Sequence, residues 1–417
     1  MQQELLPQLF KTEYRKIVSV LYKLFGLDHI EIAEDVVSDV FLLASETWGL
    51  KGIPENPTAW LYVVSKNRTK DYLKRNSLFQ QTIQREILNS SSASQEIEID
   101  LSDKNITDSQ LQMMFAICHP AISPEAQVCL SLRFLCGFSI DEIANAFQSN
   151  KETINKRLFR AKEKLRADKV KIEYPGKAEI AKRLETVATT LYLLFNEGYF
   201  ATNKNVKLQK EFCLEAMRLM YMLVENETTN LPFINALLSL MCFHSSRFDA
   251  RLNENGESIL YQDQDEKLWN QELIERGKYY LDEAFKTDNI SKYHLQASIA
   301  FLHTSQADSS NKWNNVLQLY NLLLQLEYSP IVALNRTYAL AKVKGKPEAI
   351  AEAEKLNLAD NHLYHSLLGD LYTDLDNKKA ILSFQTALTL AKSNGDKTMI
   401  TNKIISCKRT NNSNYFP

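Results

Sequence analysis

Residues that form turns are scarce in this sequence. Its 417 residues include only 11 glycines and 10 prolines. Proteins rich in β-strands need a turn after nearly every strand, and glycine and proline supply many of those turns. Apolar residues still make up 45% of the chain, which is enough to build well-packed cores. The composition therefore predicts an all-α protein, and the length predicts about two to four domains.

Cysteines and long apolar runs are also in short supply. The six cysteines are scattered, none belongs to a Cys-x-x-Cys pair, and none stands at a metal-site spacing from a histidine. We therefore expect reduced, buried thiols, no metal and no cofactor. No charged-then-apolar signal segment follows Met1, and the most apolar stretches are too short to cross a bilayer. These absences predict a cytoplasmic protein that does not associate with membranes.

Charge is distributed unevenly along a chain whose net charge is only -2. Residues 151–173 contain nine Lys or Arg against four Asp or Glu, and residues 61–75 contain five basic residues against one acidic residue. Residues 76–108 show the opposite bias, with six acidic residues against two basic ones. Two basic segments that flank an acidic one are a better indication of a nucleic-acid partner than the net charge is.

Residues 138–166 read as two helices joined by a short turn. Ser139 and Glu142 form a capping box, in which each side chain satisfies a backbone N–H at the helix start. Asn150 follows the turn and is expected to cap the second helix. Apolar residues at helical spacing predict the buried side of that helix, which consists of Ile154, Leu158, Ala161 and Leu165.

The opposite side of the second helix is polar and basic. Such a side suits the major groove of DNA, because Lys and Arg neutralise phosphates while polar side chains contact base edges. An ordinary amphipathic surface helix with a solvated basic face would show the same pattern. We predict DNA binding through this face, which consists of Lys151, Thr153, Asn155, Lys156, Arg157 and Arg160.

Three sequence blocks together resemble a known family. Residues 33–48 (AEDVVSDVFLLASETW), 56–75 (NPTAWLYVVSKNRTKDYLKR) and 123–165 are similar to conserved regions of extracytoplasmic-function sigma factors of the sigma-70 family. In that family the first block docks on the clamp helices of the largest polymerase subunit. The second block reads and melts the -10 promoter element, and the third, region 4, binds the -35 element. The resemblance implies a promoter-recognising factor whose partners are core RNA polymerase, through its clamp helices and flap, and promoter DNA.

Two segments are expected to contact the polymerase. On the exposed side of the helix at 33–48, the resemblance implies contacts by Asp35, Ser38 and Asp39. The acidic segment at 76–109 matches the family's connector, which runs into the RNA channel of the polymerase, where anionic residues stand in for nascent RNA. A merely solvated linker would have the same composition.

The second block is expected to hold the -10 contacts. Asn56-Pro57 is typical of a helix start, because Asn caps and proline at the first position loses no hydrogen bond. The loop at 52–56 matches the family's pocket for a flipped base. Trp60 is either a stacking platform for a base or a core residue. The predicted -10 contacts are Asn56, Trp60, Lys66, Asn67, Arg68, Lys70, Lys74 and Arg75.

Residues 175–417 look helical throughout and exceed what such a sigma factor needs. Segments such as 190–202 resemble the subgroup whose members end in a large tetratricopeptide-like helical domain. Residues 364–391 resemble one tetratricopeptide unit, in which small residues let two helices pack closely. A loop is expected at 253–267, with a turn or short hairpin at Asn255-Gly256. We expect this domain to regulate the factor in place of a separate anti-sigma protein.

A set of polar residues surrounds one aromatic residue in this C-terminal part. Two of its carboxylates suggest a metal or acid–base pair, but no histidine motif, phosphate loop or nucleophile elbow accompanies them. A site for an unknown small ligand or protein is the second interpretation, and structural capping and hydrogen bonding is the third. The candidates are Asn196, Glu197, Asp249, Arg251, Asp263, Gln264, Asp265 and Trp269.

The sequence thus predicts an all-α fold in four parts. These are a sigma region 2 bundle at 1–75, an acidic linker at 76–109, a helix-turn-helix region 4 at 110–174 and a tetratricopeptide-like array at 175–417. A conventional DNA-binding regulator would leave residues 10–75 without a role, and an enzyme or scaffold would leave both basic segments without one. We therefore predict a sigma factor that is not an enzyme and whose C-terminal domain modulates its activity.

Overall fold

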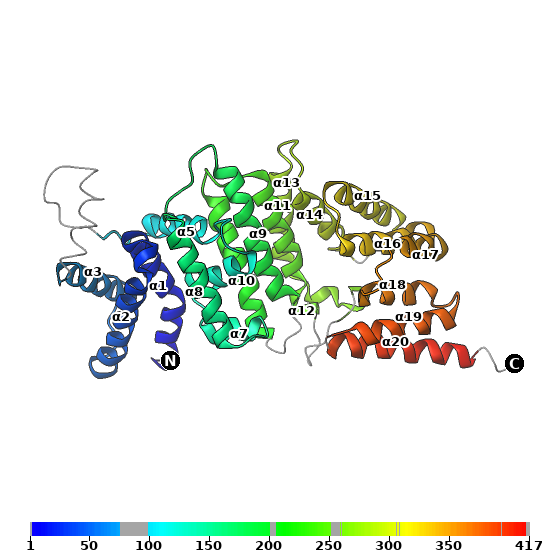
Figure 1. Cartoon of the computed structure of the whole chain (residues 1–417), viewed down its shortest axis with the longest axis horizontal. Helices are drawn as coiled ribbons and strands as arrows, with labels where there is room; N and C mark the ends of the chain where they lie inside the picture. Colours follow the sequence, from blue (N-terminus) through cyan, green and yellow to red (C-terminus); the bar gives the residue numbers. More distant parts are fainter. Residues whose placement is uncertain are drawn as a thin grey trace. The chain divides into compact units, whose positions relative to one another are not determined.

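The computed structural model of the chain is built from helices (Figure 1). It describes residues 2–75, 99–200, 206–251, 259, 261–305, 307, 309–392 and 394–413. Every regular element in these ranges is helical, which confirms the predicted all-α fold. Within the same ranges, no helix combines the length and apolarity that a membrane span requires. The hairpin predicted at Asn255-Gly256 and most of the acidic linker lie outside the described residues.

The chain divides into two compact units. The first comprises residues 1–198 and 214–229, and the second comprises 199–213 and 230–417. The first unit holds both predicted promoter-binding regions and continues beyond Pro175-Gly176, where the sequence suggested a boundary. The first helices of the C-terminal part therefore share a compact unit with regions 2 and 4.

The N-terminal bundle consists of three helices. They are α1 (Gln2–Phe25), α2 (Ile30–Lys51) and α3 (Pro57–Arg75), with the short turn η1 (Leu27–His29) between the first two. Apolar residues recur every three or four positions in α1 and α2, so each helix presents one apolar side to its neighbours. The residues on these apolar sides are buried, among them Ile17, Leu21, Val36, Val37 and Val40.

The next described helix after α3 begins at Asp103. Helix α5 (Asp103–Ile117) starts within the predicted linker, because Ser102 caps it by accepting the N–H of Asn105. Ser123 caps the next helix in the same way, with proline at its first position. The elements after α5 are α6 (Pro124–Leu130), η2 (Ser131–Leu135), α7 (Ile140–Ala146) and α8 (Lys151–Ala167).

The C-terminal part opens with α9 (Ile180–Tyr199) and α10 (Val206–Glu225), most of whose residues belong to the first unit. In the second unit, each helix from α13 onward packs against the next one along the chain (Figure 1). Its elements are α11 (Pro232–Ser246), α12 (Phe248–Arg251), η3 (Tyr261–Asp263), η4 (Glu266–Leu268), α13 (Gln271–Ala284), α14 (Lys292–Leu302), α15 (Ser310–Leu326), α16 (Pro330–Lys344), α17 (Lys346–Lys355), α18 (His362–Tyr372), α19 (Asn377–Leu390) and α20 (Asn394–Ser413).

The helix pair expected at 364–391 is formed by α18 and α19. Gly369 lies directly against Phe384, so that a Cβ at this glycine would come within 2.5 Å of the ring. Ala380 and Ala387 are fully buried beside it. The small residues thus allow the close packing that the sequence predicted.

Candidate nucleic-acid interface

The predicted helix-turn-helix is formed by α7 and α8. The backbone N–H of Ser139 donates to Glu142 at 2.8 Å, and the Ser139 side chain accepts the N–H of Glu142. In the turn, Gln148 adopts a φ of 46°, a left-handed conformation that costs a residue with a Cβ about 1 kcal/mol. Asn150 Oδ1 then accepts the N–H of Thr153 at 2.7 Å. Both predicted caps are therefore confirmed.

Helix α8 turns one side into region 4 and the other to solvent. The four residues of its predicted apolar stripe, Ile154, Leu158, Ala161 and Leu165, are buried. Most of the predicted DNA contacts are exposed on the opposite side, namely Lys151, Thr153, Asn155, Lys156 and Arg160.

Arg157 is the exception among the predicted contacts. It is half-buried, and its Nη1 atom lies 3.5 Å from the Sγ of Cys129 in α6. Its guanidinium group also lies over the ring of Phe147, 5.7 Å from the centroid. Arg157 therefore helps to hold α8 within region 4, whatever it contacts on DNA.

A cationic pocket of about 430 Å³ opens along α8. Basic side chains of α8 form one wall, and the segment leading into α6 forms the other. The described residues that line it include no Asp or Glu, so its surface suits the oxygen atoms of a phosphate group. The lining residues are Ala121, Ile122, Ser123, Ala126, Thr153, Lys156, Arg157, Arg160, Ala161 and Lys164.

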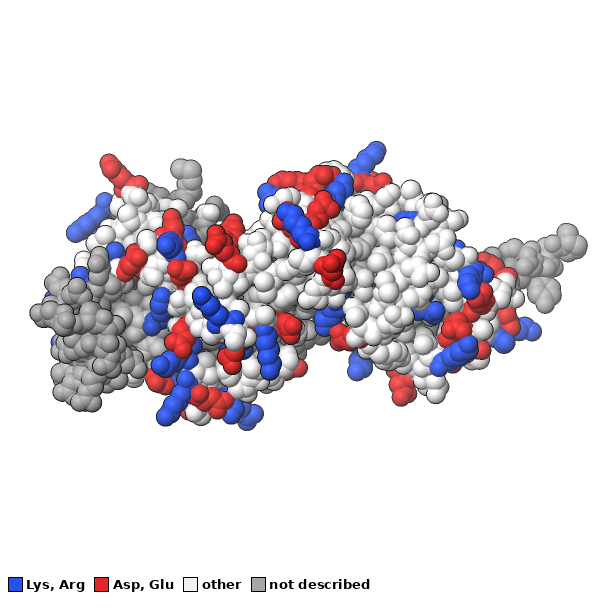
Figure 2. Space-filling model, turned by 90° about the horizontal axis from the view of Figure 1, so that it is seen from above, with Lys and Arg blue, Asp and Glu red and all other residues white. Residues whose placement is uncertain are grey.

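Two of the exposed lysines on α8 form surface ion pairs. Lys151 lies 2.6 Å from Asp141, and Lys156 lies 2.6 Å from Glu152. Exposed pairs of this kind contribute about 0–1 kcal/mol, so a DNA phosphate can replace either carboxylate at little cost. Figure 2 shows basic and acidic side chains interspersed over the face of the molecule that it draws.

Helix α3 presents an apolar surface first and a basic one later. Asn56 Oδ1 accepts the N–H of Ala59 at 2.9 Å, which confirms the predicted helix start. Trp60 is half-buried, with its ring 5.4 Å from that of Trp48, and Val63 is 57% exposed. Both interpretations of Trp60 therefore remain open. Farther along, Asn67, Arg68, Lys74 and Arg75 are exposed, and Lys66 and Lys70 are half-exposed.

The predicted polymerase contacts lie on one side of α2. Asp35, Ser38 and Asp39 are all exposed, while the adjacent Val36, Val37 and Val40 are buried. This is the division between solvent and core that the helical spacing predicted.

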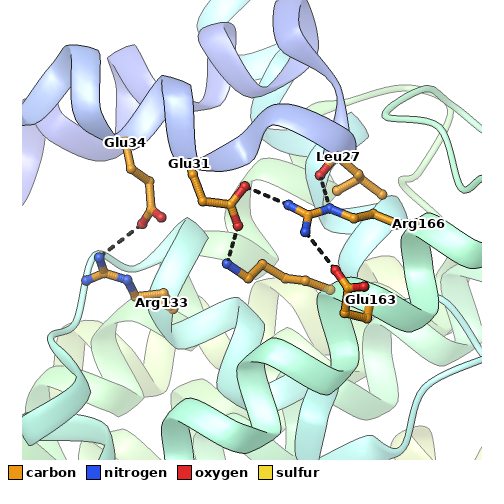
Figure 3. A network of polar contacts seen from close by, with 7 residues as sticks. Leu27, Glu31, Glu34, Arg133, Glu163 and Arg166 are labelled. Atoms are coloured by element: carbon orange, nitrogen blue, oxygen red, sulfur yellow. Dashed lines mark hydrogen bonds and ion pairs between the residues drawn. The ribbon is translucent and has the colours of Figure 1, made fainter.

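An ion-pair network that the sequence did not reveal joins α2 to α8 (Figure 3). The Glu31 carboxylate lies 2.6 Å from Lys162 and 2.6 Å from Arg166. Arg166 also donates to the carbonyl of Leu27 at 2.9 Å. Partial burial alone would raise the pKa of Glu31, but the hydrogen bond and charge of Lys162 and the charge of Arg166 hold that pKa below its usual value. The Glu31 carboxylate is therefore ionised at neutral pH.

A second pair lies one turn farther along α2. Glu34 accepts from Arg133 of η2 at 3.0 Å. Next to this pair, the rings of Tyr22 and Phe134 meet edge to face with their centroids 5.2 Å apart, and both are almost fully buried. Burial, followed by the charge of Glu34, raises the pKa of the Tyr22 hydroxyl. The contact between the two regions thus has an apolar centre beside charged groups.

A half-buried ionic triad connects α1, α10 and η2. Glu215 of α10 lies 2.5 Å from Arg15 of α1 and 2.8 Å from Arg218. Arg218 donates in turn to the carbonyl of Leu135 at 2.8 Å. Burial would raise the pKa of Glu215, but the charges of Arg218 and Arg15 hold it below its usual value. Glu215 contacts the N-terminal bundle and Arg218 contacts region 4, so these two residues of the C-terminal part together link the bundle to region 4.

Helix α9 adds polar contacts to region 4. The buried hydroxyl of Thr190 donates to Gln127 of α6 at 2.7 Å, and Arg183 donates to the carbonyl of Phe115 at 2.6 Å. Gln127 is itself fixed by donating to the carbonyl of His119 at 3.0 Å. Region 4 is thus hydrogen-bonded to the helix that follows it.

The predicted C-terminal candidates are distributed over both units. Asn196 and Glu197 lie in α9 and belong to the first unit, where both are half-buried and burial raises the pKa of Glu197. In the second unit, Asp249 pairs with Lys210 at 2.9 Å. Arg251 donates to the carbonyl of Tyr199 and lies 3.9 Å from the centroid of its ring. These contacts join Asp249 and Arg251 to neighbouring parts of the second unit.

The remaining polar candidates lie in and around η3 and η4. Asp263 is exposed, and Asp265 caps η4 by accepting the N–H of Lys267 at 2.9 Å. Gln264 is buried and donates to the carbonyl of Ile259 at 3.3 Å. Within the described parts of the chain, no group of His, Cys, Asp and Glu is arranged to hold a metal ion.

Trp269 lies in a cationic aromatic cluster that includes residues not singled out from the sequence. It is 4% exposed and stacks on Tyr261, with Arg247 over both rings. Lys312 donates to the Tyr261 hydroxyl at 3.1 Å. Burial, followed by the charges of Arg247 and Lys312, lowers the pKa of His303 to about 4, so this histidine is neutral at pH 7.

Three family models match successive parts of the chain. Residues 9–79 match Sigma-70 region 2, residues 117–165 match Sigma-70, region 4, and residues 183–285 match a family of unknown function, DUF6596. The chain is also 32% identical over 371 residues to Uncharacterized protein R00370 of Rhizobium meliloti (strain 1021), and the match covers 87% of each protein. No solved structure matches the chain significantly.

The two sigma regions coincide with the parts of the structure that carry the basic helices. Region 2 covers the bundle of α1, α2 and α3, and region 4 covers the helix-turn-helix. The chain belongs to the sigma-70 family, whose members direct RNA polymerase to promoters as initiation factors rather than as enzymes.

Proposed function

We propose that this chain is an extracytoplasmic-function type of sigma factor that binds a promoter at both its -35 and its -10 element. In this proposal the exposed face of α8 reads the -35 element and α3 reads and melts the -10 element. Core polymerase binds through the clamp-helix surface of α2 and through its flap. The C-terminal domain is a tetratricopeptide-like array that modulates these activities.

The observation that carries the proposal is the polar face of α8 beside a cationic pocket. Thr153 and Asn155 project near the capped start of the helix, where a recognition helix meets base edges. Lys156, Arg160 and Lys164 line the adjacent pocket, where they can neutralise backbone phosphate. Base-reading and phosphate-binding groups are therefore adjacent on one helix.

The order of side chains along α3 supports a role at the -10 element. The partly exposed Trp60 and the exposed Val63 come first, and the basic residues 66–75 follow. An unstacked base needs an apolar or aromatic surface, whereas the flanking backbone needs cations. The predicted capture loop at 52–56 directly precedes this surface.

The proposed polymerase contact rests on Asp35, Ser38 and Asp39, which are exposed on one side of α2. The proposed modulation rests on α9 and α10, which are hydrogen-bonded and ion-paired to region 4 and to α1. The residues of α9 and α10 that make these contacts all fall within the segment that matches DUF6596. A ligand or protein partner at the C-terminal domain remains a prediction.

Run-off transcription tests the proposal against a conventional DNA-binding regulator. Purified chain and core polymerase are incubated with the upstream region of the chain's own gene, and gel shift of the same DNA is measured without polymerase. We expect a defined transcript with polymerase and weak binding without it. A conventional regulator would instead bind the free DNA tightly and give no transcript with core polymerase.

The modulation is tested by truncation after Asn230, because this cut retains all of the first compact unit. We expect the truncated chain to give a different transcript yield from the full chain at equal concentration. Equal yields, and an equal response to the inducing condition in cells, would contradict modulation by the second unit.

A further inference from the structure

We propose that the cationic aromatic cluster of the second unit binds the carboxylate or phosphate group of a small molecule. A role for this site in modulation rests on the proposed function, but the binding itself does not. All of the residues that form the site belong to the second compact unit. They are Arg247, Tyr261, Trp269, His303 and Lys312.

Four side chains from separate elements meet at the ring of Tyr261 in η3. Trp269, which follows η4, stacks on this ring with the centroids 6.1 Å apart, and His303, which follows α14, meets it edge to face at 5.1 Å. The guanidinium group of Arg247, at the end of α11, lies 5.3 Å from the ring centroid. The ammonium group of Lys312 in α15 also lies 5.3 Å from it. The fold thus gathers two cations, an indole and an imidazole around one tyrosine.

Three nitrogen atoms of this cluster are buried and have no acceptor among the described residues. They are Nε of Arg247, Nε1 of Trp269 and Nδ1 of His303. The arginine and tryptophan atoms can only donate, and a neutral imidazole can carry its proton on Nδ1. A buried donor without an acceptor is costly, and folded proteins supply a partner for nearly all of them. Three such donors on residues that contact the same ring point to a bound acceptor.

The charge of the cluster favours an anionic acceptor. Within the described ranges, Arg247 contacts the rings of Tyr261 and Trp269 but no carboxylate. Lys312 is 8% exposed and donates to the Ser305 carbonyl at 2.5 Å, in addition to the Tyr261 hydroxyl. Both cations act on His303, whose pKa they lower together with burial. An oxyanion beside His303 would therefore be attracted by both cations and accept from the three donors.

Burial restricts the ligand to a small molecule. Trp269 is 4% exposed, and the Lys312 ammonium lies within the same buried cluster. The phosphate backbone of a duplex cannot reach atoms at this depth, whereas a single oxyanion group on a small molecule can. The site is also held in place before any ligand arrives, because the N–H of Asn270 donates to the carbonyl of Ser246 at 2.8 Å and ties Trp269 to the end of α11. Little ordering is therefore needed on binding.

The alternative occupant is an ordered water molecule. Water can accept from the same donors, but it carries no charge to offset the two cations. The two occupants differ in one measurable respect. An oxyanion site saturates with added anion, whereas a water site does not respond to it.

The indole N–H resonances of the full chain test the site by NMR. The chain has four tryptophans, and Trp269→Phe identifies the resonance of Trp269. Inorganic phosphate is titrated in one arm and acetate in the other, both at pH 7 and at constant ionic strength in chloride. Trp48 is the internal control, because its Nε1 is also buried without a partner among the described residues, but no described cation lies over its ring.

We expect the Trp269 resonance to move downfield and to saturate with a Kd of about 1–10 mM in at least one arm. Saturation by phosphate alone would identify a phosphate ligand, and saturation by acetate alone would identify a carboxylate. Arg247→Gln and Lys312→Met should each raise the Kd by about tenfold or more, because each removes a charge-assisted contact. Lys278→Gln is the matched control with an unchanged Kd, since Lys278 is an exposed cation of the same unit.

Thermal unfolding checks that each variant is folded, and two site variants are used so that misfolding of one does not decide the result. A Trp269 resonance that does not saturate in either arm would overturn the proposal in favour of an ordered water. Equal shifts of Trp48 and Trp269, or a wild-type Kd in the folded site variants, would show an adventitious ion only. No polymerase is present in these titrations, so failure of the site leaves the proposed function standing, and failure of run-off transcription leaves the site standing.

Discussion

The Nζ atom of Lys162 lies 2.6 Å from the carboxylate of Glu31, although 131 residues separate the two in sequence. The lysine belongs to the helix proposed to read the -35 element, and the glutamate belongs to the helix proposed to dock on polymerase. One ion pair thus joins the helix proposed to bind DNA to the helix proposed to bind polymerase. Helix α8 thus has an exposed N-terminal half and a C-terminal end that contacts α2.

The contact between α2 and α8 should weaken in acid. The pKa of Glu31 is held below its usual value in the folded chain, so the contact gains stability from this carboxylate above about pH 4.5. That stability is lost as the pH falls through the lowered pKa. We expect energy transfer between dyes attached through Lys51→Cys and Asn145→Cys, two exposed positions in regions 2 and 4, to be constant from about pH 6 to 8 and to fall below about pH 4.5. A transition near neutral pH would show that another group controls the contact.

Glu215→Ala should destabilise the first compact unit by about 1–3 kcal/mol, because it leaves the half-buried charges of Arg15 and Arg218 without their carboxylate. Hydrogen exchange of α1 and α10 in increasing urea measures this loss. Glu152→Ala is the matched control in the same unit, since its ion pair with Lys156 is exposed and contributes less than about 1 kcal/mol. Equal effects of the two substitutions would contradict the role assigned to the triad.

Asn155→Ala and Arg157→Ala should have different effects, although both residues are predicted DNA contacts. Asn155 is exposed, so its loss should relax -35 recognition by about 1–3 kcal/mol without changing the stability of region 4. Arg157 contacts Cys129 and Phe147, so its loss should lower recognition and stability together. Run-off transcription on -35 variants and thermal unfolding separate the two effects. A normal promoter preference in Asn155→Ala would place the recognition face elsewhere.

Trp60→Ala should reduce promoter melting, whereas Trp60→Phe should retain most of it, because a phenyl ring still offers a surface for an unstacked base. Permanganate reactivity of thymines around the -10 element measures the melted state. Thermal unfolding of the same variants reports on the contact with Trp48. A loss of stability with normal melting would identify Trp60 as a core residue.

Local features of the sequence predicted much of the fold. The caps at Ser139 and Asn150 and the apolar stripe of α8 follow from interactions between residues three or four apart, and each is present as predicted. The tight helix pair at Gly369 and Phe384 follows from small residues at helical spacing. Such signals are short-range and can therefore be read from one chain.

Contacts between distant segments could not be predicted in the same way. Glu31 and Lys162 each look like ordinary surface residues, and only the fold brings them together. The one available signal was a charged residue within an apolar run, as at Arg133 and Glu215, because such a charge is buried only with a partner. The start of α5 within the acidic segment was also missed, since the cap at Ser102 lies among residues of linker-like composition.

Run-off transcription with purified chain and core polymerase tests the central claim most directly. On a promoter-containing template, the full chain should produce a transcript from one defined start site. Base changes in either the -10 or the -35 element should abolish it. Failure of the chain to bind core polymerase, or a transcript that does not depend on either element, would contradict the account.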